Sequence, residues 1–187
     1  MMIFRETLRA NNIPYDPELI YNCDWDSKVC AAQVKELLSK HPETEVIFAG
    51  SDSLASVILS QLKKLNLKCP QDIGVVGFND ISLSKNFSPA LTTVRLPSAE
   101  MGKLAAEVLI RQIKSNSVLK QQILLPVELK VRESNSKIPI KLSKTPKVQF
   151  PFHFPETALF LFISSIAERA KRQNRFSVLP FFNQLSI

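Results

Sequence analysis

The fold is decided by one continuous stretch of the sequence: EVIFAG (45–50), SDSLASVILSQLKKLN (51–66) and, after a short turn, IGVVGF (73–78). The first and last segments are short apolar runs, as expected of strands buried on both faces of a sheet. The middle segment opens with Ser-Asp-Ser, which suits a helix cap, and continues with apolar residues at helical spacing. Strand, helix and strand over about 30 residues form a βαβ unit. We therefore predict an α/β fold in which residues 46–50 and 73–77 are adjacent parallel strands, with helix 53–66 packed across them.

The flanking segments carry further helix and strand patterns. In chain order we expect the end of a helix at 4–13, a strand at 18–23, a helix over 27–40, an irregular polar loop at 79–97, a helix over 98–115 and an extended segment at 122–134 broken by Pro126. The periodicity of the second helix directs Val29, Ala32 and Leu37 toward the core. The last helix has an apolar stripe formed by Met101, Leu104, Ala105, Val108, Leu109 and Ile113.

Polar and aromatic side chains follow three of the predicted strands. They are Asp24-Trp25, Ser51-Asp52 and Asn79-Asp80. Ligands of open parallel sheets collect at the carboxyl ends of the strands, so these groups are expected to meet there. An aromatic face beside carboxylates and an amide suits a polyol, whose C–H faces stack on the ring while its hydroxyls bond the polar groups. Spacing alone leaves a second interpretation equally open, in which Trp25 belongs to the core and Asp52 and Asp80 only cap helices.

The sequence offers little for catalysis, cofactors or metals. It contains no G-x-G-x-x-G, phosphate-binding loop or G-x-S-x-G motif, and no histidine near a candidate nucleophile. Cys23, Cys30 and Cys69 form no C-x-x-C pair, and His41 and His153 are the only histidines. We therefore expect no enzyme activity, no cofactor and no metal. Reduced thiols, the absence of a signal-peptide pattern and the absence of a long apolar run favour a cytoplasmic protein without a membrane segment.

Composition divides the chain near residue 136. Residues 1–136 hold 16 Lys and Arg against 15 Asp and Glu, whereas residues 137–187 hold 8 against 2. All four glycines precede the division, and 8 of the 12 phenylalanines follow it. We therefore predict a globular domain over 1–136 and a basic, Phe- and Pro-containing tail over 137–187. The origin of the tail stays open between a frame-altered end and a genuine appended segment that binds a partner or a membrane surface.

Four motifs in order make residues 3–134 resemble the lac/galactose-repressor family of transcription regulators. They are a strand ending in VIFAGSD, the segment CPQDIGVVGFND, the segment SPALTTV and the closing LLPVELKVRES. The resemblance implies a type I periplasmic-binding-protein-like core, of which this chain holds mainly the C-terminal lobe. It also implies a cleft that binds a sugar effector.

The resemblance also suggests roles for individual residues. It implies that Trp25, Ser51 and Asn79 contact the effector, with Asp24 beside them, and that Asp52 and Asp80 are adjacent structural acids. Asn79 stands where many members have Asp, so the choice of sugar is expected to differ. Residues 53–65 and 81–87 resemble the region through which such repressors form homodimers.

The sequence departs from the family at both ends. The family's helix-turn-helix head and most of its first lobe would precede Met1, so we expect operator DNA to be bound only by a full-length relative. In the family the helix matching 98–115 packs on the first lobe, and residues from Lys137 onward match nothing. Two other functions are disfavoured: a free-standing sugar-binding protein by the absence of a signal peptide, and an enzyme on the same scaffold by the absence of a nucleophile–base pair.

Overall fold

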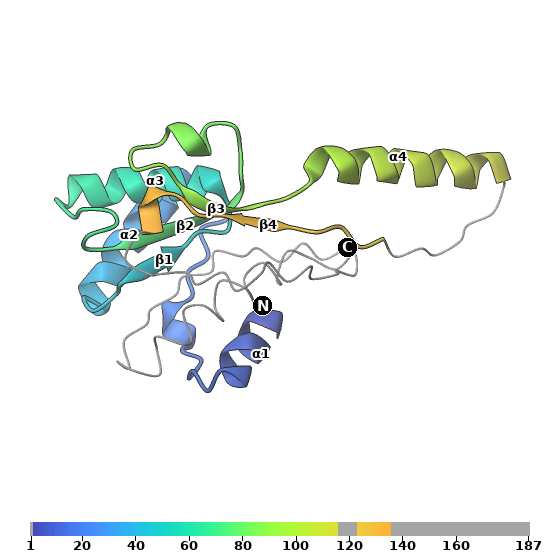
Figure 1. The fold of residues 1–187 in the computed structure, drawn as a ribbon. Helices are drawn as coiled ribbons and strands as arrows, with labels where there is room; N and C mark the ends of the chain where they lie inside the picture. Colours follow the sequence, from blue (N-terminus) through green and yellow to red (C-terminus); the bar gives the residue numbers. More distant parts are fainter. Residues whose placement is uncertain (1, 116–122, 136–187) are drawn as a thin grey trace.

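A four-stranded mixed sheet forms the centre of the protein (Figure 1). The structure is a computed structural model, and it describes residues 2–115 and 123–135. The strands are β1 (Val46–Phe48), β2 (Gly74–Asn79), β3 (Thr92–Arg95) and β4 (Glu128–Lys130), in the order β1-β2-β3-β4. Val46 pairs with Gly74 in the parallel β1–β2 ladder, which confirms the two predicted parallel strands. β3 is also parallel to β2, whereas β4 is antiparallel to β3. The prediction of a parallel sheet therefore holds for β1, β2 and β3 but not for β4.

Four α-helices accompany the sheet in the described residues: α1 (Met2–Ala10), α2 (Ser27–Lys40), α3 (Asp52–Lys64) and α4 (Ser98–Ser115). α2 begins where the Asp26 carboxylate accepts hydrogen bonds from the backbone N–H groups of Lys28 and Val29. α3 begins where Ser51 Oγ accepts from the N–H of Leu54 at 3.2 Å. These two caps explain why the predicted helix starts are close to the observed ones.

The strand predicted at 18–23 is absent. Residues Pro17–Leu19 form a 3-10 turn instead, capped by Asp16, whose side chain accepts from the N–H of Glu18. Residues 20–23 then run without strand pairing, although Tyr21 and Cys23 are buried. The apolar residues that suggested a strand therefore serve the core without joining the sheet.

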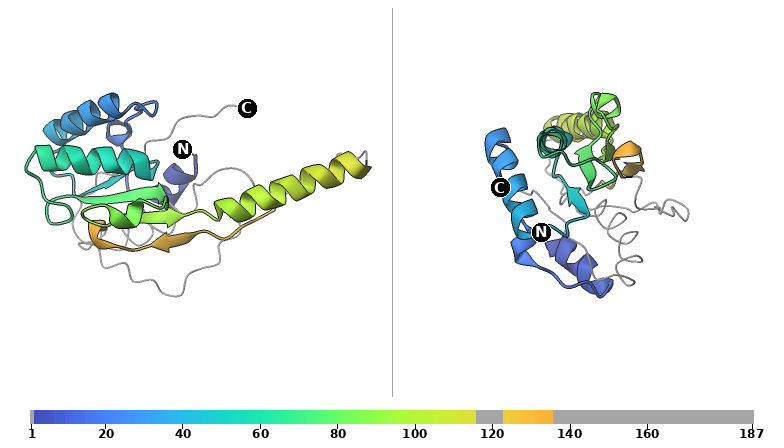
Figure 2. Two further views of the ribbon diagram at one scale, coloured as in Figure 1. Left: turned by 90° about the horizontal axis from the view of Figure 1, so that it is seen from above. Right: turned by 90° about the vertical axis from the view of Figure 1, so that its left-hand side faces the viewer.

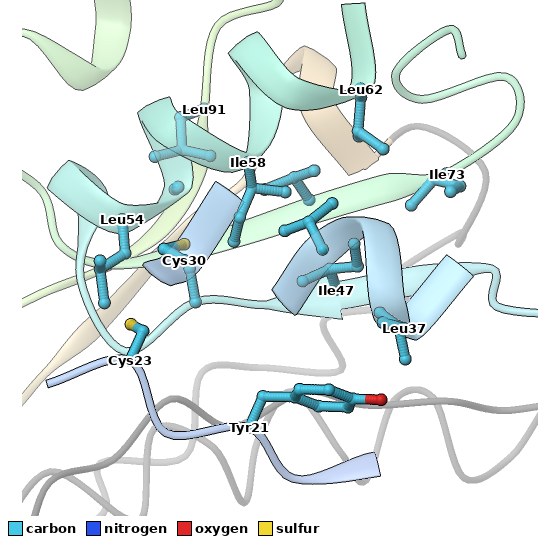
Figure 3. Close-up of a cluster of buried hydrophobic side chains, with 14 residues drawn as sticks. Tyr21, Cys23, Cys30, Leu37, Ile47, Leu54, Ile58, Leu62, Ile73 and Leu91 are labelled. Carbon is cyan, nitrogen blue, oxygen red and sulfur yellow. The ribbon is translucent and has the colours of Figure 1, made fainter. Parts of the chain in front are cut away.

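The larger core lies between the sheet and the helices α2 and α3 (Figure 3). From α2 it takes Cys30, Val34 and Leu37, which recur at helical spacing. The expectation for Leu37 is confirmed, but that for Val29 and Ala32 is wrong, because these two residues are exposed. A smaller core covers the other face of the sheet and joins Leu8 of α1 to Phe48, Val76 and other strand residues. The two cores reflect the alternation of side chains along each buried strand.

α4 has the predicted bounds but a different environment from the other helices. It extends away from the sheet, as Figure 1 and the left-hand view of Figure 2 show. Within the described part of the chain, no residue of α4 is buried. Leu109 and Ile113, two members of the predicted apolar stripe, are 58% and 70% exposed. The stripe is therefore present without a covering element among the described residues.

Hydrogen bonds hold the closing segment, residues 132–134, to the sheet and to the residues before β3. Ser134 Oγ donates to the carbonyl of Val75 at 2.6 Å and accepts from the N–H of Thr92 at 2.8 Å. The N–H of Arg132 donates to Thr92 Oγ1, and Glu133 accepts from the N–H of Ala90. Each residue of the Arg-Glu-Ser motif thus bonds a segment about 40 or more residues earlier. The domain boundary proposed at residue 136 lies at the limit of the described residues.

Candidate functional site

The carboxyl edge of β1 and β2 carries two of the predicted groups. Ser51 follows β1, and Asn79 is the last residue of β2. Because β1 and β2 are parallel neighbours, both groups lie at the same edge of the sheet. Ser51 is buried and Asn79 is partly exposed. The structure therefore brings Ser51 and Asn79 to one edge, as the spacing predicts.

Asp24 and Trp25 reach this region from the turn before α2. The N–H of Asp26 donates to the carbonyl of Cys23 at 2.7 Å and closes the turn. Cys23 lies in the same core cluster as Leu54 of α3, next to the beginning of that helix (Figure 3). The Trp25 side chain is 59% exposed, so the interpretation that places it in the core is wrong. An exposed aromatic ring on a tight turn is available to a ligand.

Residues with positive φ occur in the turn before α2 and in the turn that follows β2, and they were not predicted from the sequence. Asp24 and Trp25 have φ values of 43° and 63°, and Asn79 and Asp80 have values of 107° and 55°. Non-glycine residues adopt this region at a cost, and such residues concentrate at functional sites. Asn and Asp tolerate positive φ better than other side chains, which is a weak sequence signal for the second turn. For Trp25 the residue type gives no such signal.

Asp52 and Asp80 do not cap helices. Ser51 is the N-cap of α3, and Asp52 instead accepts hydrogen bonds from Ile81, Ser84 and Thr93. Asp80 pairs with Arg132, whose Nη2 lies 2.6 Å from Asp80 Oδ1. Arg132 also donates to the carbonyl of Leu91 through Nη1.

The polar partners of these two acids were not found from the sequence. Two signals were available. Arg132 is part of the closing motif, and Gly77 lies in the middle of an apolar strand, where a glycine often marks the close approach of another group.

Burial keeps the three cysteines protonated. Burial raises the pKa of the Cys30 thiol to about 12 and that of the Cys69 thiol to about 11. Burial also raises the pKa of Cys23. All three thiols are therefore protonated at neutral pH in the metal-free protein, which makes them weak nucleophiles. In the described residues no group of three His, Cys, Asp or Glu is placed to hold a metal ion.

The fold is that of an α/β domain with a mixed four-stranded sheet, and comparison with known proteins identifies its family. Residues 2–135 match the model of the periplasmic binding protein-like domain, and the chain belongs to that family. Its relatives in the family are transcription regulators, which confirms the resemblance to the lac/galactose repressors. The HTH-type transcriptional repressor PurR of Vibrio vulnificus is 30% identical over 135 residues, covering 72% of this chain and 40% of that protein.

Two solved structures of regulators have the same fold. A complex of the transcriptional regulator CelR with cellobiose is 30% identical, with a TM-score of 0.65, over 70% of this chain and 40% of that one. A LacI family regulator from Arthrobacter sp. FB24 in complex with lactose is 29% identical, with a TM-score of 0.54, over 60% and 42% of the two chains. This chain thus spans about two fifths of the length of the regulators it matches. In the described residues, no helix is long and apolar enough to cross a membrane.

Proposed function

We propose that the chain is the effector-binding part of a sugar-responsive transcription regulator, a repressor of a carbohydrate-utilisation operon. The observation that carries the proposal is the exposed Trp25 ring, held on a positive-φ turn that follows Cys23, which packs beside the beginning of α3 (Figure 3). The sugar complexes of the two similar regulators support the ligand class. Such a regulator acts in the cytoplasm, where its operator DNA is.

Four side chains would bind the sugar. The face of Trp25 stacks on the C–H groups of a pyranose or furanose ring. The exposed Asp24 carboxylate accepts hydroxyl protons, and the Ser51 hydroxyl both donates and accepts. Asn79 offers an amide N–H as well as a carbonyl oxygen. A site with one charged acceptor and one amide favours a neutral sugar, whose hydroxyls can both donate and accept.

A homodimer through residues 53–65 and 81–87 completes the proposal. Ser53 and Ser60 of α3 are exposed there, and Ser56 is partly exposed. Leu83 on the adjacent loop is 59% exposed. An exposed leucine beside small polar side chains is the type of surface that a second copy covers.

The ligand proposal is tested by the fluorescence of Trp25, the only tryptophan. Cellobiose, lactose and ribose are titrated into the purified chain. The exposed ring would cover a sugar from one side only, so we expect a dissociation constant on the order of 1 mM for at least one sugar. Asn79→Ala should weaken that binding, whereas the matched change Asn66→Ala, at an exposed position that also has positive φ, should not. Fluorescence that no sugar changes, even far above the millimolar range, would exclude the proposed site.

A further inference from the structure

A buried carboxylate lies directly beneath the candidate site. Asp52, in the first turn of α3, has no exposed surface. Its Oδ2 accepts from the N–H of Ile81 at 2.8 Å and from the Ser84 hydroxyl, and its Oδ1 accepts from the Thr93 hydroxyl at 2.5 Å. Burying a carboxylate is costly unless its charge is met. Here hydrogen-bond donors meet it, together with the positive end of the α3 dipole.

The strand beside Asp52 is shaped to admit this carboxylate. A Cβ atom on Gly77 of β2 would overlap Asp52 Oδ1 and would lie 2.7 Å from the side chain of Leu91. Gly77 therefore provides the space that the carboxylate occupies. A glycine costs backbone entropy in a strand, so its presence in the centre of β2 indicates that this space is used.

The two oxygens of Asp52 serve different parts of the molecule. Oδ1 bonds the sheet through Thr93, whereas Oδ2 bonds only the loop that leaves β2, at Ile81 and Ser84. Ile81 directly follows Asn79 and Asp80, which both have positive φ. Arg132 holds Asp80 from the other side. Two charged side chains therefore bind this turn: the Asp52 carboxylate accepts from the N–H of Ile81, and the Arg132 guanidinium pairs with Asp80.

We infer that Asp52 is a positioning residue, which holds the Asn79–Asp80 turn in its positive-φ conformation and so orients the Asn79 amide toward the ligand. The ligand part of this inference rests on the proposed function. The conformational part does not, because it concerns the free protein. Without Oδ2, the backbone of the turn is expected to relax to the more favourable negative φ.

Hydrogen exchange, followed by NMR, tests the conformational part on the full chain. The variant Asp52→Ala removes both oxygens, and the control Thr93→Val removes only the Oδ1 partner, leaving the loop bonds in place. Exchange at the Ile81 amide is compared with exchange at the Val76 amide in β2, so that a general loss of stability cancels. We expect the ratio to rise roughly tenfold or more in Asp52→Ala and to stay unchanged in Thr93→Val.

A milder variant covers the case in which Asp52→Ala does not fold. Ser84→Ala removes one of the two loop donors and should raise the same ratio to a smaller extent. Asp52→Asn should restore most of the protection, because its amide oxygen still accepts from Ile81 and Ser84, and the Thr93 hydroxyl can turn to accept from its amide nitrogen. Equal ratios in Ser84→Ala and Thr93→Val would overturn the inference.

Sugar titration of the same variants tests the ligand part. Asp52→Asn should bind the sugar nearly as the unchanged chain does, and Ser84→Ala should bind it several-fold more weakly than Thr93→Val. A sugar that binds all three equally would overturn the positioning of Asn79. A chain that binds no sugar would exclude the proposed function, while the exchange ratios would still decide whether Asp52 holds the turn.

Discussion

At the scale of single residues, the backbone of the candidate site is held by contacts with distant parts of the chain. Ser51 and Asn79 were predicted from their places after two strands, and they lie at the same edge of the sheet. Asp24 and Trp25 were selected in the same way, although the segment before them is not a strand. The positive φ values of Asp24 and Trp25 did not follow, since a backbone angle at a turn depends on where the chain must go next. The partners of Asp52 are 29 to 41 residues distant in the chain, beyond the range of local patterns.

The chain provides a matched pair of glycines for a stability test. Gly77→Ala forces a methyl group against Asp52 and Leu91, and it should lower the free energy of unfolding by about 1–3 kcal/mol. Gly102, in α4, has nothing within 4 Å of the corresponding Cβ position, so Gly102→Ala should be neutral or raise it by about 0.4–1 kcal/mol. Urea unfolding of both variants measures the difference. Equal effects of the two changes would show that Asp52 and Leu91 do not need the space beside Gly77.

Burial of Cys30 predicts a loss of stability at alkaline pH. The pKa of its thiol is about 12 in the folded protein, whereas an unburied cysteine, as in the unfolded chain, has a pKa of 9.0. Between these values the unfolded state releases the thiol proton and the folded state keeps it, so stability falls as the pH rises from about 9 to 12. Cys30→Ala should flatten this decline, measured as the unfolding midpoint against pH. A decline that is unchanged in the variant would assign it to other groups, such as Tyr21, whose pKa burial also raises.

At the scale of elements, capping and periodicity predicted helices more accurately than apolar content predicted strands. α2 and α4 have the predicted bounds, and α3 differs by one residue at its start and two at its end. The strand predicted at 18–23 failed because burial of Tyr21 and Cys23 does not require a hydrogen-bonded neighbour. The antiparallel direction of β4 depends on how the chain returns after α4, which no short-range pattern encodes.

The exposure of α4 predicts that its apolar stripe adds little to the stability of the chain. The double variant Leu109→Gln, Ile113→Gln should change the free energy of unfolding by less than about 0.5 kcal/mol. Leu62→Ala, in the fully buried face of α3, should cost about 2–5 kcal/mol. Thermal unfolding followed by circular dichroism compares them. Both variants are compared at dilutions at which the chain is monomeric, and a large loss in the α4 variant there would show that the stripe is covered within one chain.

At the scale of the whole molecule, an exposed stripe of this kind favours association. Leu109, Ile110 and Ile113 are each more than half exposed on a helix that extends from the body (Figure 2). Uncovered apolar surface of this extent associates in water. We therefore expect the purified chain to form species larger than a dimer, and the Leu109→Gln, Ile113→Gln variant to form mainly dimers. Light scattering after size exclusion measures both. Adding Leu83→Glu should then yield monomers, and a dimer that survives this change would contradict the proposed interface.

The bonds made by the closing segment also have a consequence for how the protein is synthesised. Arg132 meets Asp80 across 52 residues, and Ser134 meets Val75 across 59. Until these residues leave the ribosome, β3 lacks its last neighbour and Asp80 lacks its counter-ion. At about 5–20 residues per second, the delay between the emergence of β3 and that of Ser134 is on the order of several seconds. The nascent chain therefore spends that interval with an unpaired strand edge, which is the period in which a chaperone would have to protect it.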